Sequence, residues 1–245
     1  MANKKVIKKI ILFFSIFTFI FAEESTGNFI PKKPEVPKQF CAETKKFYEI
    51  MDTSADFVDI SSFENVSFDL RYASFNNISG HNLYCSGKRV FLHRDAVKKF
   101  KKAIHLLNEK QPDFKFVVFD AARPLYAQEA LRKTVRGTPY SHYVSSPKPG
   151  GMHNFGMALD LSILDSSNTP LDMGTDFDSF EKAAGKSGET EALKTGRLTE
   201  QQIQNRELLR QIMKEAGFTP LPSEWWHFNA YPSNVIRKNY KRLSF

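Results

Sequence analysis

GGMHNFGMALDLSIL, residues 150–164, is the stretch of sequence that decides the fold. From Met157 to Leu164 apolar residues alternate with small or polar ones, which predicts a strand buried on its apolar face. The opposite face of this strand carries Asp160 at its centre. Gly156 lets the chain turn sharply into the strand, so His153 can fold back over the carboxylate of Asp160. The alternative is a turn histidine that only hydrogen-bonds to the start of a strand.

A second pair of polar residues, Glu224 and His227, lies in the segment EWWH, some 64 residues after Asp160. Residues three apart in a straight strand point to opposite faces, so a turn or bulge is needed to bring this pair into one cleft. Two imidazoles and one carboxylate can hold a zinc ion with a coordination position left open, and a second carboxylate can serve as general base. His153 would supply the other imidazole of such a hydrolytic site. The alternative is an aromatic core strand in which the polar residues are incidental.

The other four histidines are interpreted as structural or solvated, because each lies in a turn, in a loop or off the apolar stripe of a helix. They are His81, His93, His105 and His142. His142 is the one most able to contact a substrate, since its loop adjoins the predicted site.

Arg123 is predicted to lie at a strand-to-helix corner. Residues 114–119 form a compact apolar strand, and Pro124 biases the preceding arginine toward extended backbone. Proline also suits the first turn of a helix, which we expect to run through residues 125–136. Side chains at such corners commonly face a cleft.

The remaining pattern predicts two more strands, two more helices and a region of poor periodicity. The strands are expected at residues 66–72 and 89–92, and the poorly periodic region, 175–198, as a long loop or short helical pieces. One helix is expected to be capped by Asp95, and the other to run between a capping box at Thr199 and Gly217. This inventory predicts a single α+β domain with a mainly antiparallel central sheet flanked by helices.

Residues 1–22 have the composition of a signal peptide. Four lysines precede an apolar run that is too short for a comfortable transmembrane span, and the segment ends in a small residue. We expect cleavage and export of the mature chain to the periplasm or another extracytoplasmic space, with no stable membrane span afterwards. An uncleaved anchor is the alternative, because Ile20 is larger than ideal three residues before the cut.

The mature chain is expected to begin with an extended tether, residues 23–40, whose lysines, prolines and glutamates favour solvated backbone. The domain then spans residues 41–245. Removing the four lysines of the signal segment lowers the formal net charge from +8 to +4, and no dense basic cluster remains, so nucleic acid is not an expected partner. Cys41 and Cys85 are the two cysteines; an exported chain permits one disulfide, and two free thiols are the alternative.

Five motifs, in the same order, make residues 60–245 resemble the zinc D-alanyl-D-alanine dipeptidases, within the wider zinc D,D-carboxypeptidase superfamily. The last motif does most to separate this match from chance. The motifs are DLRYASFNNISG at residues 69–80, FDAARP at 119–124, HNFGMALDL at 153–161, DMGTDFD at 172–178 and EWWH at 224–227.

The resemblance implies one Zn²⁺ per chain, held by His153, Asp160 and His227. Glu224 would be the general base, and Arg123 would stabilise the oxyanion formed at the peptide carbonyl. Two further positions match residues that line the substrate pocket in the family: Tyr72 and Asp178. A buried carboxylate at Asp178 would suit the free ammonium of a dipeptide.

The chain departs from the family pattern beside the pocket. Gly151 and Met152 stand where Ser-Ser or Ser-Arg is frequent before the first ligand, and Ala122 stands where an aromatic is frequent before the arginine. These departures bear on substrate preference. The expected activity is hydrolysis of D-Ala-D-Ala or a related short D-amino-acid peptide from cell-wall metabolism. The alternatives are a D,D-carboxypeptidase or endopeptidase acting on peptidoglycan stem peptides, and a non-catalytic zinc-dependent peptidoglycan-binding protein.

Overall fold

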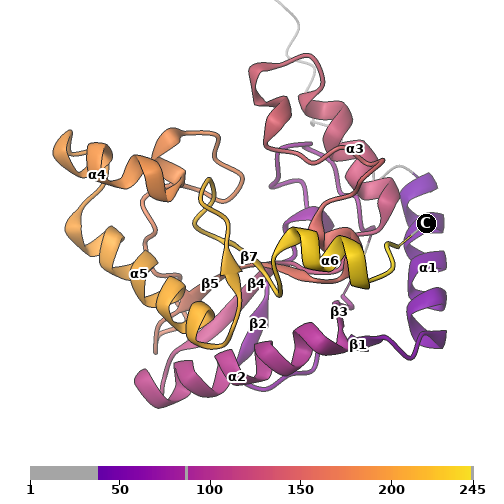
Figure 1. Ribbon diagram of the computed structural model, residues 1–245, viewed down its shortest axis with the longest axis horizontal. Helices are drawn as coiled ribbons and strands as arrows, with labels where there is room; N and C mark the ends of the chain where they lie inside the picture. The colour runs from indigo at the N-terminus through magenta and orange to yellow at the C-terminus, as the bar shows by residue number, and fades with distance from the viewer. Residues whose placement is uncertain (1–37, 86–87, 244–245) are drawn as a thin grey trace, which may run out of the picture. The chain divides into compact units, whose positions relative to one another are not determined.

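The strand predicted within residues 150–164, β5 (Ala158–Leu164), is the middle strand of a five-stranded sheet in this computed structural model (Figure 1). The sheet order is β2-β4-β5-β7-β6. Strands β2 and β4 pair in parallel, and the other neighbours pair antiparallel, which confirms a mainly antiparallel sheet. The bounds of its other strands are β2 (Val66–Phe68), β4 (Lys115–Asp120), β6 (Thr219–Pro220) and β7 (His227–Asn229).

A β-bulge in β4 decides which side chains reach the polar face of this sheet. Val118 lies opposite Leu161 and Asp120 lies opposite Asp160, so one extra residue of β4 is accommodated between the two pairs. Asp160 in turn lies opposite His227 of β7. Residues directly opposite one another share a face, so the two carboxylates and the imidazole converge from three neighbouring strands.

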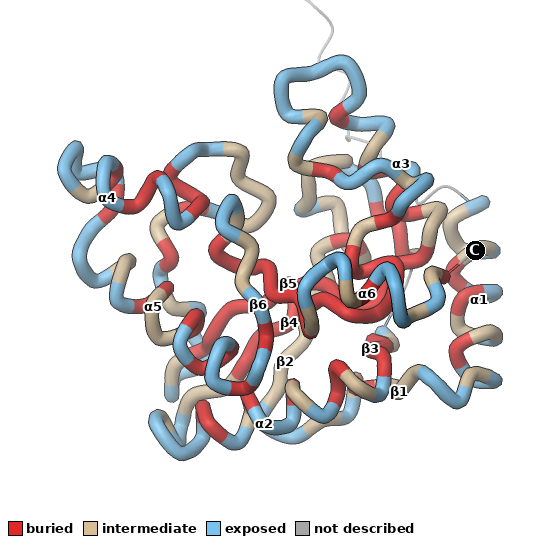
Figure 2. The backbone as a smooth tube through the Cα atoms, viewed as in Figure 1, coloured by how far each residue is buried: buried red, intermediate tan, exposed pale blue. Residues whose placement is uncertain are grey.

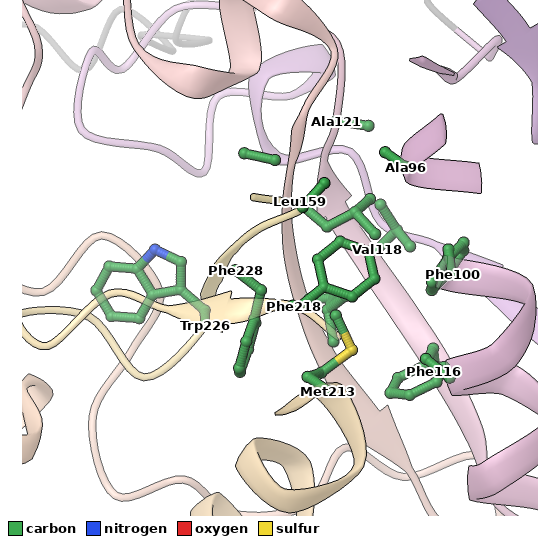
Figure 3. Packing of buried hydrophobic residues seen from close by; sticks show 14 of the residues in the cluster. Ala96, Phe100, Phe116, Val118, Ala121, Leu159, Met213, Phe218, Trp226 and Phe228 are labelled. Atoms are coloured by element: carbon green, nitrogen blue, oxygen red, sulfur yellow. The ribbon is translucent and has the colours of Figure 1, made fainter. Parts of the chain in front are cut away.

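The other face of the sheet packs against α2 (Arg94–Lys110) and α5 (Glu200–Glu215), which contact each other (Figure 1). The rings of Phe100 from α2 and Phe116 from β4 have centroids 5.7 Å apart. Figure 3 shows these rings gathered with Leu159 of β5 and Met213 of α5. All seven residues of β5 are buried, so its polar face is covered as well (Figure 2).

Most predicted elements are present with adjusted ends. The strand expected at 66–72 stops at Phe68, and Arg71–Ala73 forms a 3-10 turn, η1. The strand expected at 89–92 is β3 (Phe91–His93), which pairs antiparallel with β1 (Phe57–Asp59) in a second sheet. The segment after residue 137 that contains His142 includes two 3-10 turns, η2 (Pro139–His142) and η3 (Met152–Phe155).

The helices follow the predicted capping signals with one correction. Pro124 caps α3 (Leu125–Val135), and the Thr199 box opens α5 as predicted. The predicted cap of α2 at Asp95 is wrong: His93 is the cap, and its Nδ1 accepts a hydrogen bond of 3.2 Å from the backbone N–H of Asp95. Asp95 lies in the first turn instead, where a carboxylate favours the positive end of the helix dipole.

Three further α-helices, α1, α4 and α6, are present among the described residues. The poorly periodic region contains a 3-10 turn, η4 (Lys182–Ala184), and α4 (Lys186–Lys194), so it forms short helical pieces, and α6 (Ser233–Asn239) follows β7. Near the start of the described chain, α1 (Lys38–Thr53) is an amphipathic helix that buries Thr44, Phe47 and Met51. The extended backbone predicted up to residue 40 is therefore replaced by a helix from residue 38.

The structure describes residues 38–243 apart from 86 and 87, so the predicted signal peptide and most of the predicted tether lie outside the described residues. The described residues form one compact unit. Within it, Cys41 of α1 and Cys85 form a disulfide, which resolves the choice between a bridge and two free thiols. Across the described residues, no helix combines the length and the apolar character needed to cross a membrane.

Candidate metal centre

His153, Asp160 and His227 form a buried cluster on the polar face of the sheet. Asp160 Oδ1 lies 2.9 Å from His227 Nδ1 and 3.2 Å from His153 Nε2, and the two ring nitrogens are 3.1 Å apart. Asp160 and His227 come from paired strands, whereas His153 comes from η3. The sequence prediction that these three residues lie together is therefore met by the geometry.

The turn that delivers His153 depends on Gly156. Its backbone has a φ of 62°, which residues with a side chain rarely adopt. A Cβ at this position would also lie 2.4 Å from Cε1 of Phe57, closer than two carbons can approach. Glycine is needed here for both conformation and space, as the sequence pattern indicated.

The outer nitrogens of both imidazoles fix which nitrogens face inward. His153 Nδ1 lies 2.7 Å from the carbonyl oxygen of Ala121, which can only accept, so Nδ1 carries the proton. His227 Nε2 lies 2.8 Å from Oδ1 of Asn229 and donates to it in the same way. In the neutral rings, His153 Nε2 and His227 Nδ1 are then unprotonated and present lone pairs to Asp160.

This donor set fits a divalent cation. Three lone-pair donors facing one another within about 3 Å repel unless a positive charge lies among them. Tetrahedral zinc with bonds of about 2.0–2.1 Å needs ligand atoms roughly 3.3 Å apart, close to the separations here. Metal-binding histidines usually donate their outer N–H to an acceptor such as a backbone carbonyl, and the Ala121 carbonyl lies in that position beside His153.

Glu224 lies at the end of a turn just before β7, with its backbone N–H donating to Leu221 O at 3.3 Å. This turn lets Glu224 and His227 share one cleft, and Glu224 Oε2 is 3.9 Å from His227 Nδ1. Its side chain is 13% exposed. Burial raises the pKa of Glu224 to about 7, and the carboxylate of Asp160 adds to the increase against the opposing effect of His227.

Arg123 follows β4 at the predicted strand-to-helix corner, and its guanidinium is fixed by contacts with Asp120 and Gln128. Its Nε and Nη2 each lie 2.8 Å from Oδ2 of Asp120, and its Nη1 donates to Gln128 Oε1 at 3.0 Å. The guanidinium lies 4.8 Å from the ring centre of Tyr72. Nη2 also lies 3.5 Å from Oδ2 of Asp160, so the positive charge sits beside the ligand cluster.

Tyr72 and Asp178 meet although they are 106 residues apart in sequence. The Tyr72 hydroxyl donates to Asp178 Oδ1 at 3.1 Å, and the backbone N–H of Ile78 approaches Oδ2 at 3.4 Å. Burial raises the pKa of Asp178 to about 7, with a further contribution from the charge of Asp160. Asp178 adopts a φ of 61°, another left-handed conformation.

One cavity of about 230 Å³ is lined by all the residues that the sequence predicted for the site. They are Tyr72, Arg123, His153, Asp160, Asp178, Glu224 and His227. The cavity therefore joins the three candidate metal donors, the half-buried carboxylate of Glu224, a guanidinium and the Tyr72–Asp178 pair in one space.

Sequence reasoning missed Asp120, Gln128 and Asn229. Asp120 is 1% exposed and orients Arg123, and its position three residues before that arginine was the available signal. Asn229 holds the His227 ring, and its alternation with His227 in one strand could have indicated it. Gln128 is one helical turn from Pro124 and has no comparable signal.

The four histidines interpreted as structural or solvated lie outside the cavity. His93 caps a helix, and the other three are exposed at their positions in the described chain. His142 does not line the cavity, but two neighbours from the same loop, Tyr143 and Ser145, do.

Comparison with known proteins gives one family and two curated relatives. A family model described as D-Ala-D-Ala dipeptidase matches residues 53–243. A D-alanyl-D-alanine dipeptidase of Escherichia coli is 32% identical over 179 residues, which cover 73% of this chain and 86% of the relative. Another D-alanyl-D-alanine dipeptidase, from Synechocystis, is 29% identical over 190 residues, with 63% of this chain and 77% of the relative covered.

Proposed function

The chain belongs to the D-Ala-D-Ala dipeptidase family, and from this premise we propose that it is a zinc peptidase that hydrolyses D-Ala-D-Ala or a closely related D-amino-acid dipeptide. The observation that carries the proposal is the orientation of His153 and His227. Each ring directs one nitrogen at Asp160, while its other nitrogen lies beside an acceptor oxygen, in the same cavity as Glu224. His153, Asp160 and His227 are the proposed zinc ligands, and Glu224 is the proposed general base.

His153, Asp160 and His227 would hold the zinc ion, which would supply a positive charge to polarise the scissile carbonyl and make water more acidic. Glu224 takes up the proton of the attacking water at its carboxylate and returns it to the leaving amine. Burial raises the pKa of the Glu224 carboxyl, which favours its taking up a proton. Arg123, fixed by Asp120 and Gln128, stabilises the negative charge that develops on the carbonyl oxygen.

The Tyr72–Asp178 pair is proposed to bind the substrate's ammonium group. Asp178 supplies the negative charge, and the Tyr72 hydroxyl and the Ile78 backbone N–H hold its carboxylate in place. A cavity of about 230 Å³ that contains this carboxylate favours a short peptide with a free amino group. This feature favours the dipeptide over the stem peptides of a D,D-carboxypeptidase.

We also propose that the protein acts after export. The Cys41–Cys85 disulfide supports this, because structural disulfides persist mainly in oxidising compartments. Retention of Glu224 and Arg123 counts against a non-catalytic peptidoglycan-binding protein, since metal binding alone requires neither residue.

The substitution Glu224→Gln tests the mechanism because it keeps the shape of the side chain and removes the base. We expect zinc content to stay at one ion per chain while the kcat for D-Ala-D-Ala falls by roughly 10²–10⁴. Metal analysis and D-alanine release are measured on the same preparations, with a stem pentapeptide as second substrate. Unchanged hydrolysis by the variant would remove Glu224 from the mechanism, and faster cleavage of the pentapeptide would favour the carboxypeptidase.

A further inference from the structure

Arg206 of α5 is an arginine whose side chain is 0% exposed, and it lies outside the catalytic cavity. An arginine remains charged when buried, so its donors must be satisfied by nearby acceptors. The nearest carboxylate oxygen, Glu189 Oε1, is 3.6 Å from Nη1, beyond a good hydrogen bond. The main partners of this guanidinium therefore have to be sought elsewhere.

Those partners all belong to one segment, residues 173–183. Nε donates to the carbonyl of Met173 at 2.7 Å, and Nη1 donates to the carbonyl of Ala183 at 2.7 Å. Nη2 donates to Thr175 Oγ1 at 3.3 Å. One guanidinium thus holds both ends of a loop, which we name the 173–183 loop.

The 173–183 loop carries Asp178 between these two anchor points, together with Ser179 and Phe180, which also line the cavity. Asp178 has a left-handed backbone, a conformation that persists only where the surroundings impose it. The hydrogen bonds from Arg206 to the ends of the loop are a physical source of that constraint.

The same contacts extend to the turn that carries Glu224. Thr175 Oγ1, which accepts from Arg206, also accepts from Trp225 Nε1 at 3.0 Å. Trp225 follows Glu224 in the chain and is buried. Two carboxylates of the site are therefore connected to one buried guanidinium through the hydroxyl of Thr175.

We propose that Arg206 is a positioning residue that holds the 173–183 loop so that Asp178 can meet the ammonium of the dipeptide. The inference rests on the proposed function and deepens it, because it assigns the specificity for a free amino group to a side chain that never touches substrate. It also gives Thr175 of the DMGTDFD motif a role, because its hydroxyl accepts from Arg206.

Arg206→Lys in the full-length chain tests the proposal. Lysine keeps the charge but cannot donate to three separated acceptors at once. We expect KM for D-Ala-D-Ala to rise by between about tenfold and a hundredfold, a size typical of misplaced binding groups. Zinc content should be unchanged, because the metal donors lie on other segments.

Arg210→Lys is the matched control. Arg210 lies one turn later on the same helix, is also buried, and bonds to the carboxylates of Glu189 and Glu207 rather than to the 173–183 loop. We expect its KM to stay within about twofold of the unmodified protein. Equal KM values for the two variants would overturn the proposal, whereas absence of D-Ala-D-Ala hydrolysis in the unmodified protein would overturn the proposed function instead.

A double-substitution cycle separates positioning from general stability. If Arg206 acts through Asp178, Arg206→Lys should change kcat/KM by less than about twofold in an Asp178→Ala background. Equal losses in the two backgrounds would contradict the proposal. Should Arg206→Lys fail to fold, Thr175→Val removes the hydroxyl that Arg206 and Trp225 share, and wild-type KM in that folded variant would likewise contradict it.

Discussion

At the scale of single residues, Asp178 combines a functional charge with a cost to stability. Burial and the nearby charge of Asp160 raise its pKa to about 7, so the folded protein resists its ionisation. Binding of an ammonium group requires the ionised form. The residue proposed to recognise substrate is therefore one that the fold accommodates poorly when it is charged.

Asp178→Asn should weaken substrate binding and stabilise the fold at alkaline pH. At pH 8 Asp178 is ionised in both folded and unfolded chains, and the folded chain bears the cost of burying the charge. The neutral amide removes this cost, so we expect Tm at pH 8 to rise by roughly 2–4 °C. As pH falls from about 7 toward 4, the folded chain takes up a proton at Asp178 and the advantage of the amide should fade.

Asp176→Asn is the control for this measurement, because Asp176 lies in the same loop and is exposed. Its Tm should change little at either pH. A D178N variant whose Tm gain is the same at pH 5 and pH 8 would show that the stabilisation does not come from the buried charge. The same variant should bind D-Ala-D-Ala more weakly, measured as an increase in KM.

The local sequence pattern predicted the positions of His153 and Asp160 relative to one another, and the family resemblance added His227 as the third candidate ligand. A glycine at a left-handed turn and a period of two along β5 are visible within a dozen residues. Asp120 was missed for the opposite reason: a β-bulge turns it toward Asp160, and a bulge shifts the register of a strand without leaving a clear pattern in its residue types.

At the scale of elements, the connection between η3 and β5 requires a glycine, Gly156, because of its backbone conformation and its close packing. Gly156→Ala places a Cβ within 2.4 Å of the Phe57 ring at a positive φ. We expect a loss of unfolding free energy of about 2 kcal/mol or more, with weaker zinc binding because His153 is displaced. Denaturant unfolding and zinc titration measure the two effects.

Gly196→Ala separates the cost of the positive φ from the cost of the steric clash. Gly196 has a φ of 72°, but a Cβ added there would meet no atom within 4 Å, so its substitution carries the conformational cost without the clash. It should lose only about 1 kcal/mol and should bind zinc normally. An equal loss at the two positions would mean that packing against Phe57 is unimportant.

Helix ends and short strands were the elements least predictable from sequence. Helix α1 begins within a segment whose prolines and lysines favour extended backbone, and its apolar stripe is stabilised by packing on Phe91 from a distant strand. Strand β2 ends at Phe68 because the chain turns into η1, which places Tyr72 in the cavity. In both cases tertiary contacts outweigh local propensity.

At the scale of the whole molecule, the Cys41–Cys85 disulfide ties α1 to the segment before β3. It closes a loop with a sequence separation of 44, and the sequence left open whether the bond forms because this depends on the distance between the two residues in space. The double substitution of Cys41 and Cys85 by serine should lower the free energy of unfolding by about 2–4 kcal/mol. Denaturant unfolding checks this value.

Neither cysteine lines the catalytic cavity, so the serine variant should retain zinc binding and kcat below its unfolding temperature. Parallel unfolding of the unmodified protein with and without reductant provides the control. A serine variant as stable as the oxidised protein would show that packing alone holds α1.

The pairing of β5 with β7 joins Asp160 to His227 across 67 residues of sequence. Such long-range pairing is slow in folding, because a large loop must close before the contacts form. An unfolded chain therefore holds no preassembled set of three donors, and tight capture of an ion follows the closure of the sheet. Because the donors come together only on folding, we expect the ion to bind no earlier than in the compartment where the chain folds.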